Sequence, residues 1–189
     1  GSAAAYGAAM AASLVAMVGR LTVGKKKYAE VEDQMWPLID EATQLKQKMH
    51  AAVAEDAAAF EAYMQARRLP RDDDQQKSER IEAIHSASIN AAKVPLHVAR
   101  AALEILQLAL IAAELGNVNA ISDAGASGTF ARATLHSAGL NVRINLLGLE
   151  KEPLPAEMLN ELKNLEKQAD QRRETLQPLL NERGGLNLS

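Results

Sequence analysis

An apolar residue recurs every three or four positions from Val31 to Tyr63, and this spacing predicts a long amphipathic helix. The alternating steps of four and three are similar to those of a coiled coil, where one stripe of a helix packs against a neighbouring helix. Pro37 lies inside the pattern and is expected either to start its regular part or to kink it, because proline lacks a backbone N–H. The stripe consists of Val31, Met35, Leu38, Ala42, Leu45, Met49, Ala52, Ala59 and Tyr63.

A polar connection follows this helix and leads into a second long helical segment. A proline and a run of acidic residues make residues 69–77 a loop, and Asp74 or Ser78 is expected to cap the next helix. The helical pattern then runs to Leu115. Pro95 interrupts it, which predicts either two helices or one bent helix.

The remaining third of the chain predicts two more helices. Gly116 ends the preceding helix, and Ser122 or Asp123 is expected to cap a helix that reaches about Leu147. A last amphipathic helix is predicted over residues 155–181, followed by a loose tail. No strand pattern or internal repeat occurs.

The composition agrees with a single all-α domain over residues 1–189, a bundle of about five to seven helices. Alanine is abundant and aromatic residues make up only 3% of the chain, which favours helix over sheet. The alanine-rich segment 3–19 resembles the core of a signal peptide, but no basic region precedes it, and it is short for a membrane span. We therefore expect it to be a buried helix that packs closely against its neighbours, and we expect no membrane association.

Charge and residue content exclude several classes of function. The net charge of -3 provides no positive field for nucleic acid. The chain has no cysteine, which excludes thiol chemistry and is compatible with the cytoplasm. The four histidines are dispersed without metal-ligand spacing, so we expect no metal site.

The segment GRLTVGKKKY, residues 19–28, fits the start of a P-loop pattern, G-x-x-x-x-G-K. A P-loop also needs a preceding strand and a hydroxyl residue after the lysine, whereas here a helix precedes Gly19 and Lys26 occupies the hydroxyl position. The nucleotide interpretation therefore fails. Two alternatives stay open for Lys25, Lys26 and Lys27: a solvated surface turn, or an anchor for a carboxylate or phosphate.

Asp56 is the unusual residue of the long helix, because the apolar stripe continues through its position. A carboxylate on that face is costly unless it is paired, hydrogen-bonded or open to a cavity. Asp56 is therefore either a buried acid satisfied by a neighbouring helix or subunit, or an acid–base group in a cleft.

Two clusters of polar residues lie in the second half of the chain. The first, in GNVNAISD, is either a cap and turn or a set of donors and acceptors for a polar heterocycle. The second, in NVRINL, cannot lie entirely on one solvent face of a helix, so it indicates interhelical hydrogen bonds or ligand contacts. The clusters contain Asn117, Asn119, Ser122 and Asp123, and Asn141, Arg143 and Asn145, respectively.

Six short segments stand out along the chain: LTVGKKKY (21–28), EDAAAF (55–60), LP (69–70), VPL (94–96), GNVNAISD (116–123) and NVRINL (141–146). In this order they resemble the cyclodeaminase/cyclohydrolase family, which includes the cyclodeaminase part of formiminotransferase-cyclodeaminase and the bacterial methenyltetrahydrofolate cyclohydrolases. The resemblance covers essentially the whole chain and rests on the order of the segments, since none is decisive alone.

The family also carries a glycine-rich P-G-G-G-S turn before its first helix. Gly1 and Ser2 stand in the register of that turn, so we expect this sequence to begin inside it. The resemblance then implies that Ser2 belongs to the substrate-binding loop.

The resemblance implies an all-helical homodimer or higher homo-oligomer in the cytoplasm that acts on one-carbon tetrahydrofolates, with no other cofactor and no metal. Asp56 matches the acidic position of the family and takes the acid–base role, with Asp123 as a pterin anchor or partner acid. The family often has a second acid at the position of Ala54, which puts paired carboxylates in doubt here. The implied substrate-binding residues are Ser2, Lys25, Lys26 and Lys27 for the glutamate tail, and Asn117, Asn119, Ser122, Asn141, Arg143 and Asn145 for the rings.

Two reactions fit this family. A cyclohydrolase converts 5,10-methenyltetrahydrofolate to 10-formyltetrahydrofolate, whereas a cyclodeaminase closes the ring of 5-formiminotetrahydrofolate and releases ammonia. A short chain with LTVGKKKY looks more like the bacterial cyclohydrolases, so hydrolysis is our first expectation. A non-catalytic helical oligomer that binds folate or a protein is the alternative from another class.

Overall fold

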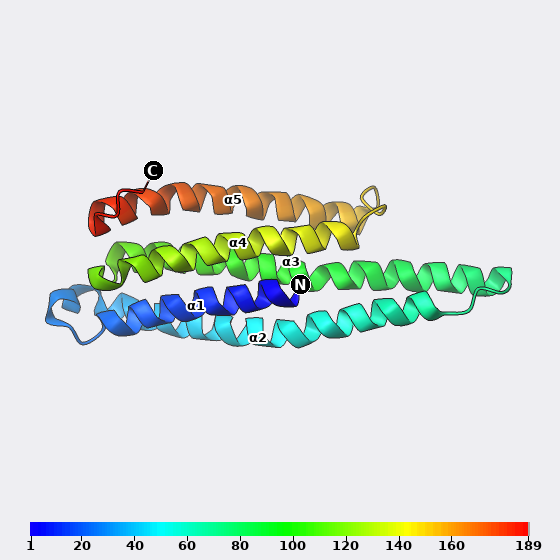
Figure 1. Ribbon diagram of the computed structural model, residues 1–189, viewed down its shortest axis with the longest axis horizontal. Coiled ribbons are helices and arrows are strands. Elements are labelled where there is room, and N and C mark those ends of the chain that lie inside the picture. The colour runs from blue at the N-terminus through cyan, green and yellow to red at the C-terminus, as the bar shows by residue number, and fades with distance from the viewer. Residues whose placement is uncertain (189) are drawn as a thin grey trace.

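The computed structural model describes residues 1–188, which form an elongated bundle of five α-helices (Figure 1). This arrangement confirms the predicted all-α class and the long amphipathic helix. The α-helices are α1 (Ser2–Thr22), α2 (Glu32–Arg68), α3 (Asp74–Leu115), α4 (Ile121–Asn145) and α5 (Pro153–Gly184), with short 3-10 helices η1 (Lys26–Val31) and η2 (Val118–Ala120).

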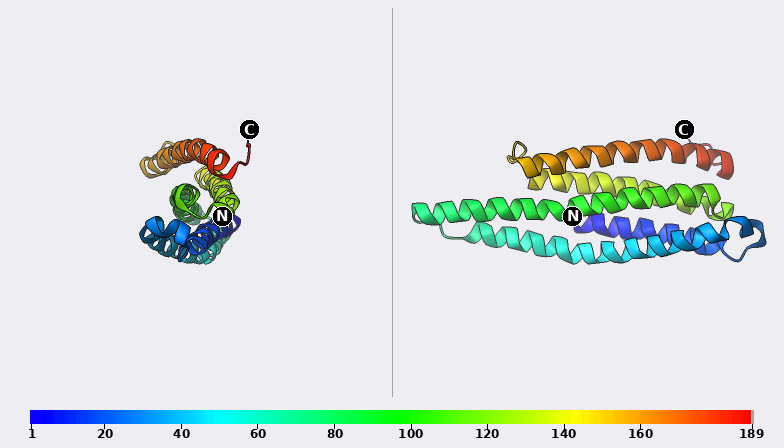
Figure 2. Two further views of the ribbon diagram at one scale, coloured as in Figure 1. Left: turned by 90° about the vertical axis from the view of Figure 1, so that its left-hand side faces the viewer. Right: turned by 180° about the vertical axis from the view of Figure 1, so that it is seen from behind.

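Helix α3 is the centre of the bundle and packs against all four other α-helices. In end view, α1 and α2 lie on one side of α3, and α4 and α5 lie on the other (Figure 2). Both α1 and α3 are long and apolar enough to span a membrane by length and composition alone. The apolar residues of α3 are mostly buried among the other helices, so its apolarity serves the core.

Helices α2 and α3 extend past the N-terminus of α1 as a two-helix arm (Figures 1 and 2). Asp73 caps α3 by accepting a hydrogen bond from the backbone N–H of Gln76 at 2.8 Å. The predicted caps, Asp74 and Ser78, were wrong by one and five residues. Three successive aspartates precede the helix, and only the backbone conformation decides which of them caps it.

Pro95 does not divide α3, contrary to one of the two expectations. Proline has no N–H to donate to the carbonyl four residues earlier, which is that of Ala91. The Asn145 side chain of α4 donates to the Ala91 carbonyl at 2.9 Å and replaces the missing donor. A hydrogen bond from a neighbouring helix thus replaces the one that Pro95 removes, and α3 continues past the proline.

Helices α1 and α4 run antiparallel in close contact. A Cβ added at Gly7 would lie 2.6 Å from Thr134 Oγ1, and the buried Ser127 hydroxyl donates to the Ala11 carbonyl at 2.8 Å. Small residues therefore set the distance between these two helices. Neither Ser122 nor Asp123 caps α4 through its side chain, because η2 leads directly into the helix at Ile121.

Candidate active site

Asp56 faces the first turn of α1, and its side chain is 23% exposed. Its Oδ2 accepts hydrogen bonds from the Ser2 backbone N–H at 2.8 Å and from the Ser2 hydroxyl at 2.7 Å. A Cβ at Gly1 would lie 1.8 Å from Asp56 Oδ1, so only glycine allows this close approach. Among residues 1–188, the hydrogen bonds to this carboxylate go to Oδ2, and Oδ1 lies against Gly1.

Asn141 of α4 completes this arrangement from the other side of α1. Its Oδ1 accepts a hydrogen bond from the Gly1 nitrogen at 3.2 Å, while its Nδ2 donates to the Ser137 carbonyl at 2.9 Å. Three residues predicted from separate parts of the sequence therefore meet at one point. We call Asp56, Gly1, Ser2 and Asn141 the Asp56 centre.

A shallow hollow lies beside the Asp56 centre, between α1 and α2. It has a volume of about 550 Å³ and is lined mainly by apolar atoms of α1 together with His50 of α2. The rings of Tyr6 and His50 meet edge to face, with centroids 6.2 Å apart. Sequence analysis missed both residues. The sequence shows that Tyr6 is aromatic and that His50 is a histidine. It does not show that they meet, because it does not give the relative register of their helices.

Lys25, Lys26 and Lys27 lie at the opposite end of α1 and are exposed. We call them the lysine turn. Because α1 has 21 residues that each rise about 1.5 Å, the lysine turn is about 30 Å from the Asp56 centre. One chain therefore does not bring these predicted residues into a single site.

Asn117 is buried next to the lysine turn, and its hydrogen bonds fasten the connection between α3 and α4 to the end of α1. Its Nδ2 donates to the Leu21 carbonyl at 2.9 Å, and its backbone N–H donates to Thr22 Oγ1 at 2.8 Å. Its Oδ1 accepts from the Asn119 N–H at 3.1 Å and from the Tyr28 hydroxyl at 3.4 Å. The cap-and-turn interpretation therefore accounts for Asn117.

Asp123 and its neighbours lie at the same end of the bundle as the lysine turn. Asp123 is in the first turn of α4, and Asn141 follows 18 residues later, which is about 27 Å along a helix. Within one chain, Asp123 is therefore too far from Asp56 to act as its partner acid. Asn119 and Ser122 are exposed at this end, also remote from Asp56.

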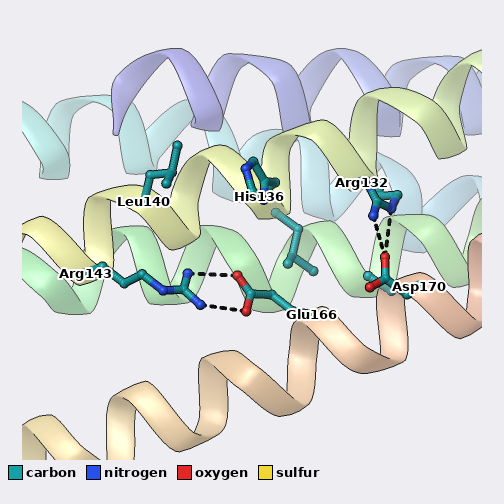
Figure 3. Close-up of a pocket in the computed structure, with 8 residues that line it drawn as sticks. Arg132, His136, Leu140, Arg143, Glu166 and Asp170 are labelled. Atoms are coloured by element: carbon teal, nitrogen blue, oxygen red, sulfur yellow. Dashed lines mark hydrogen bonds and ion pairs between the residues drawn. The ribbon is translucent and has the colours of Figure 1, made fainter.

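Arg143 points away from the Asp56 centre toward α5 (Figure 3). Its guanidinium donates to both carboxylate oxygens of Glu166, at 2.8 and 2.7 Å, and these bonds raise the pKa of Arg143 above its ordinary value. Arg132 forms a similar pair with Asp170 along the same hollow of about 380 Å³. The predicted role of Arg143 in ring binding does not fit this geometry, because residues 141 and 143 lie on opposite faces of α4. Asn145 is likewise committed to the Ala91 carbonyl.

Comparisons with known proteins agree with the helical fold and with the family that the sequence resembles. The family model described as formiminotransferase-cyclodeaminase matches residues 1–164. A methenyltetrahydrofolate cyclohydrolase from Methylorubrum extorquens is 43% identical over 165 residues, which are 87% of this chain and 79% of that protein. A formimidoyltransferase-cyclodeaminase from Sus scrofa is 31% identical over 89% of this chain, which corresponds to only 31% of the longer relative.

The fold is also that of a solved relative. The crystal structure of formiminotetrahydrofolate cyclodeaminase from Thermotoga maritima matches with a TM-score of 0.84 and 27% identity, over 95% of this chain and 86% of that chain. The sequence match and the shared fold cover nearly the same residues. The chain therefore belongs to the formiminotransferase-cyclodeaminase family.

Proposed function

We propose that this protein hydrolyses 5,10-methenyltetrahydrofolate to 10-formyltetrahydrofolate. The observation that carries the proposal is the 43% identity to the cyclohydrolase of Methylorubrum extorquens, which extends over most of both chains. The cyclodeaminase relative from Sus scrofa is less similar, and this chain spans about a third of it.

The Asp56 centre supplies the acid–base group that this hydrolysis requires. Water adds to the amidinium carbon between N5 and N10, and a proton leaves the attacking water as the tetrahedral carbon forms. The Asp56 carboxylate, which Ser2 holds through two hydrogen bonds to Oδ2, is the base of the centre and accepts that proton. The bond from the carbon to N5 then breaks, N5 takes up a proton, and the formyl group stays on N10.

The hollow beside the centre suits the flat ring system of the substrate. Tyr6 and His50 present aromatic surface, and the remaining lining is mostly apolar. The lining of the hollow includes Ala3, the residue after Ser2, so a ring bound there lies close to the Asp56 centre. Asn141 lies on the far side of the centre, and its amide bonds to Gly1 and Ser137, so it offers the ring edges only the second N–H of Nδ2 and the second lone pair of Oδ1.

Deamination of 5-formiminotetrahydrofolate is the second candidate, because the Thermotoga maritima cyclodeaminase shares the fold at a TM-score of 0.84. Both reactions pass through a tetrahedral carbon between two nitrogens and both require proton transfer. The same carboxylate can serve either reaction.

An absorbance assay with the two substrates, in separate reactions, distinguishes these functions. Loss of the methenyl chromophore from 5,10-methenyltetrahydrofolate is the result expected for the cyclohydrolase. Appearance of that chromophore from 5-formiminotetrahydrofolate would instead identify a deaminase. Absence of turnover with both substrates, together with folate binding, would leave a binding protein and overturn the enzymatic proposal.

We further propose that the protein works as a homodimer in the cytoplasm. The absence of cysteine is compatible with that compartment. Exposed apolar side chains outside the hollow, Met17 of α1 and Leu140 and Ile144 of α4, support self-association.

A further inference from the structure

The chain after α5 turns back along the helix instead of leaving it as the loose tail expected from the sequence (Figure 1). Gly185 adopts the left-handed conformation, with a φ of 65°, and its N–H donates to the Asn181 carbonyl at 2.9 Å. Glycine takes this conformation without strain, so the chain can reverse here. We call residues 185–188 the C-terminal strap.

Asn181 holds the C-terminal strap by its main chain. The Oδ1 of Asn181 accepts a hydrogen bond from the Leu188 N–H at 2.7 Å, and its Nδ2 donates to the Leu188 carbonyl at 3.1 Å. Gln177, one turn earlier on α5, donates to the same carbonyl at 3.4 Å. The Asn181 amide therefore pairs with both polar groups of one residue, as an opposite residue in a β-ladder does.

The Leu188 side chain forms one wall of a hollow between α4 and α5. This hollow has a volume of about 380 Å³, and its lining is mainly apolar. Leu176 and Leu180 of α5 line it and are buried, and a Cβ at Gly125 of α4 would lie 2.9 Å from Leu180 Cδ1. The glycine thus lets the leucine lie against the backbone of α4. The two helices together provide an apolar floor for a leucine side chain.

The C-terminal strap covers this hollow only in part. Leu186 and Leu188 remain 40% and 44% exposed, although both are apolar. A short segment at a chain end with few buried contacts opens at little cost in free energy. The strap can therefore leave the hollow without unfolding α5.

The hollow and Asn181 together have the two features by which proteins bind extended peptides. Main-chain hydrogen bonds give affinity that does not depend on sequence, and a pocket selects the side chain. Asn181 provides the hydrogen bonds, and the hollow beside Leu188 provides the pocket. The strap itself shows which class of ligand fits, namely an extended segment that carries a leucine. We call Asn181 and the hollow the strap groove.

The strap groove lies apart from the Asp56 centre. Gly128 lines the groove, and Asn141 follows 13 residues later, which is about 20 Å along α4. The family model ends at residue 164, so the part of α5 that carries Asn181 lies beyond it. The groove is therefore a separate site, and its role does not rest on the chemistry proposed for Asp56.

We propose that the strap groove is a docking site for an extended, leucine-bearing segment of another protein, and that the C-terminal strap is its intramolecular competitor. The strap occupies the groove while Leu188 is paired with Asn181. A partner segment binds when the strap lifts, and it takes over the hydrogen bonds of Leu188. Because a short tether keeps a ligand at an effective concentration on the order of millimolar, the strap weakens binding of the partner.

The docked strap is tested in the full chain by ¹⁵N relaxation. In the wild-type protein, the Leu188 amide should have a heteronuclear NOE close to that of α5. Asn181→Ala should lower this value to that of a free chain end, with an unchanged circular dichroism spectrum. Gln171→Ala is the matched control, because Gln171 is also an amide residue and is exposed on the same helix. It should leave the Leu188 amide as in the wild type.

Docking of a separate peptide is tested by fluorescence anisotropy. The probe is a labelled synthetic peptide with the sequence of residues 184–189, GGLNLS. Leu188→Asp in the full chain places a charge against the apolar hollow, which lifts the strap and leaves Asn181 in place. The peptide should bind this variant at least tenfold more tightly than it binds the wild type. Adding Asn181→Ala to Leu188→Asp should abolish binding, and so should an aspartate in place of the second leucine of the peptide.

Three results would overturn the proposal. A Leu188 amide that is as mobile in the wild type as in Asn181→Ala would show that the strap does not dock. Equal affinity of the peptide for the wild type and Leu188→Asp, or binding that survives Asn181→Ala, would place the peptide outside the groove. Absence of binding to Leu188→Asp at millimolar peptide would reduce the strap to a closure of α5 with no docking role.

Two further measurements distinguish other occupants of the groove. If decanoate binds Leu188→Asp in calorimetry and the peptide does not, the hollow holds a small apolar ligand, and the docking site is refuted. If Asn181→Ala lowers the mass of the wild-type assembly in light scattering, the strap docks on a second copy, and the intramolecular competition is refuted. None of these readouts depends on catalysis.

Discussion

At the scale of single residues, Asp56 and Glu55 are adjacent acids with different surroundings. Asp56 accepts two hydrogen bonds from Ser2 at the start of α1, whereas Glu55 is exposed and lines a different hollow, beside Lys93 of α3. We predict that Asp56→Asn lowers kcat by about 10²–10⁴-fold, the usual contribution of a general acid–base group. The amide has the size of the carboxylate and can still accept a hydrogen bond from Ser2, so folate affinity should change little.

Steady-state kinetics and equilibrium fluorescence titration with the product measure these two effects separately. Glu55→Gln is the matched control and should retain wild-type turnover. Comparable losses in both variants, or a loss of affinity that accounts for the whole effect of Asp56→Asn, would contradict the acid–base role.

Asp56 could be identified from the sequence because helical periodicity shows which face of a helix a residue occupies. Its partners could not be derived in the same way. The contacts with Ser2 and Asn141 depend on how α1 and α4 are shifted along their axes relative to α2, and periodicity carries no information about that shift.

At the scale of helices, Asn145 and Pro95 form a compensating pair. Proline leaves the Ala91 carbonyl without its donor inside α3, and Asn145 supplies a hydrogen bond from α4 at 2.9 Å. We predict that Asn145→Leu lowers the free energy of unfolding by about 1–3 kcal/mol, because a half-buried carbonyl loses its partner.

A double-mutant cycle isolates this effect. In a Pro95→Ala background the helix regains its own N–H donor, so Asn145→Leu should cost less, with a coupling energy of about 1 kcal/mol or more from urea unfolding. Additive effects of the two substitutions would show that Asn145 does not stabilise α3 in this way.

Gly7 sets the spacing between α1 and α4. A methyl group there would lie 2.6 Å from Thr134 Oγ1, which is too close for an unstrained contact. We predict that Gly7→Ala lowers stability by about 1–3 kcal/mol. For a chain of this size the melting temperature should fall by about 2–10 °C in scanning calorimetry.

The compensating variant is Gly7→Ala with Thr134→Ala, which removes the colliding hydroxyl. It should melt close to Thr134→Ala alone. If Gly7→Ala remains equally destabilising in that background, helix propensity or another contact is responsible.

The helices themselves could largely be predicted from the sequence, because the apolar stripe, the acidic loop and Gly116 are local signals. Errors occurred where a distant residue changes a local outcome. Pro95 would break an isolated helix, but Asn145 lies 50 residues away and preserves it. The cap at Asp73 was also missed, since three consecutive aspartates are chemically equivalent in the sequence.

At the scale of the whole molecule, the predicted site residues separate into two groups at opposite ends of α1. The family resemblance pointed to these polar residues but gave no distances between them. An elongated bundle spreads such residues over about 30 Å, whereas a compact fold would bring them together. Sequence periodicity could not predict this separation. It shows on which face of its helix a residue lies, but not at which end of the bundle.

The lysine turn provides the last prediction, which concerns the assembled protein and the length of its substrate. All three lysines are exposed, Lys27 Nζ lies 5.5 Å from the centroid of the Tyr28 ring, and none of the three is in an ion pair within residues 1–188, so their charges are available to an anion. Each exposed pair with a carboxylate contributes roughly 0.2–1 kcal/mol, so replacing all three lysines with glutamate should raise KM for a polyglutamylated folate by about tenfold or more. The KM for the monoglutamate should rise much less, and the difference should shrink with added salt because salt screens exposed charges.

Steady-state kinetics at low and high ionic strength measure KM for each of the two substrates. The control variant, Lys163→Glu with Lys167→Glu, should leave both KM values unchanged. Equal changes for the two substrates would mean that the lysines form a solvated turn with no role in recognising the tail.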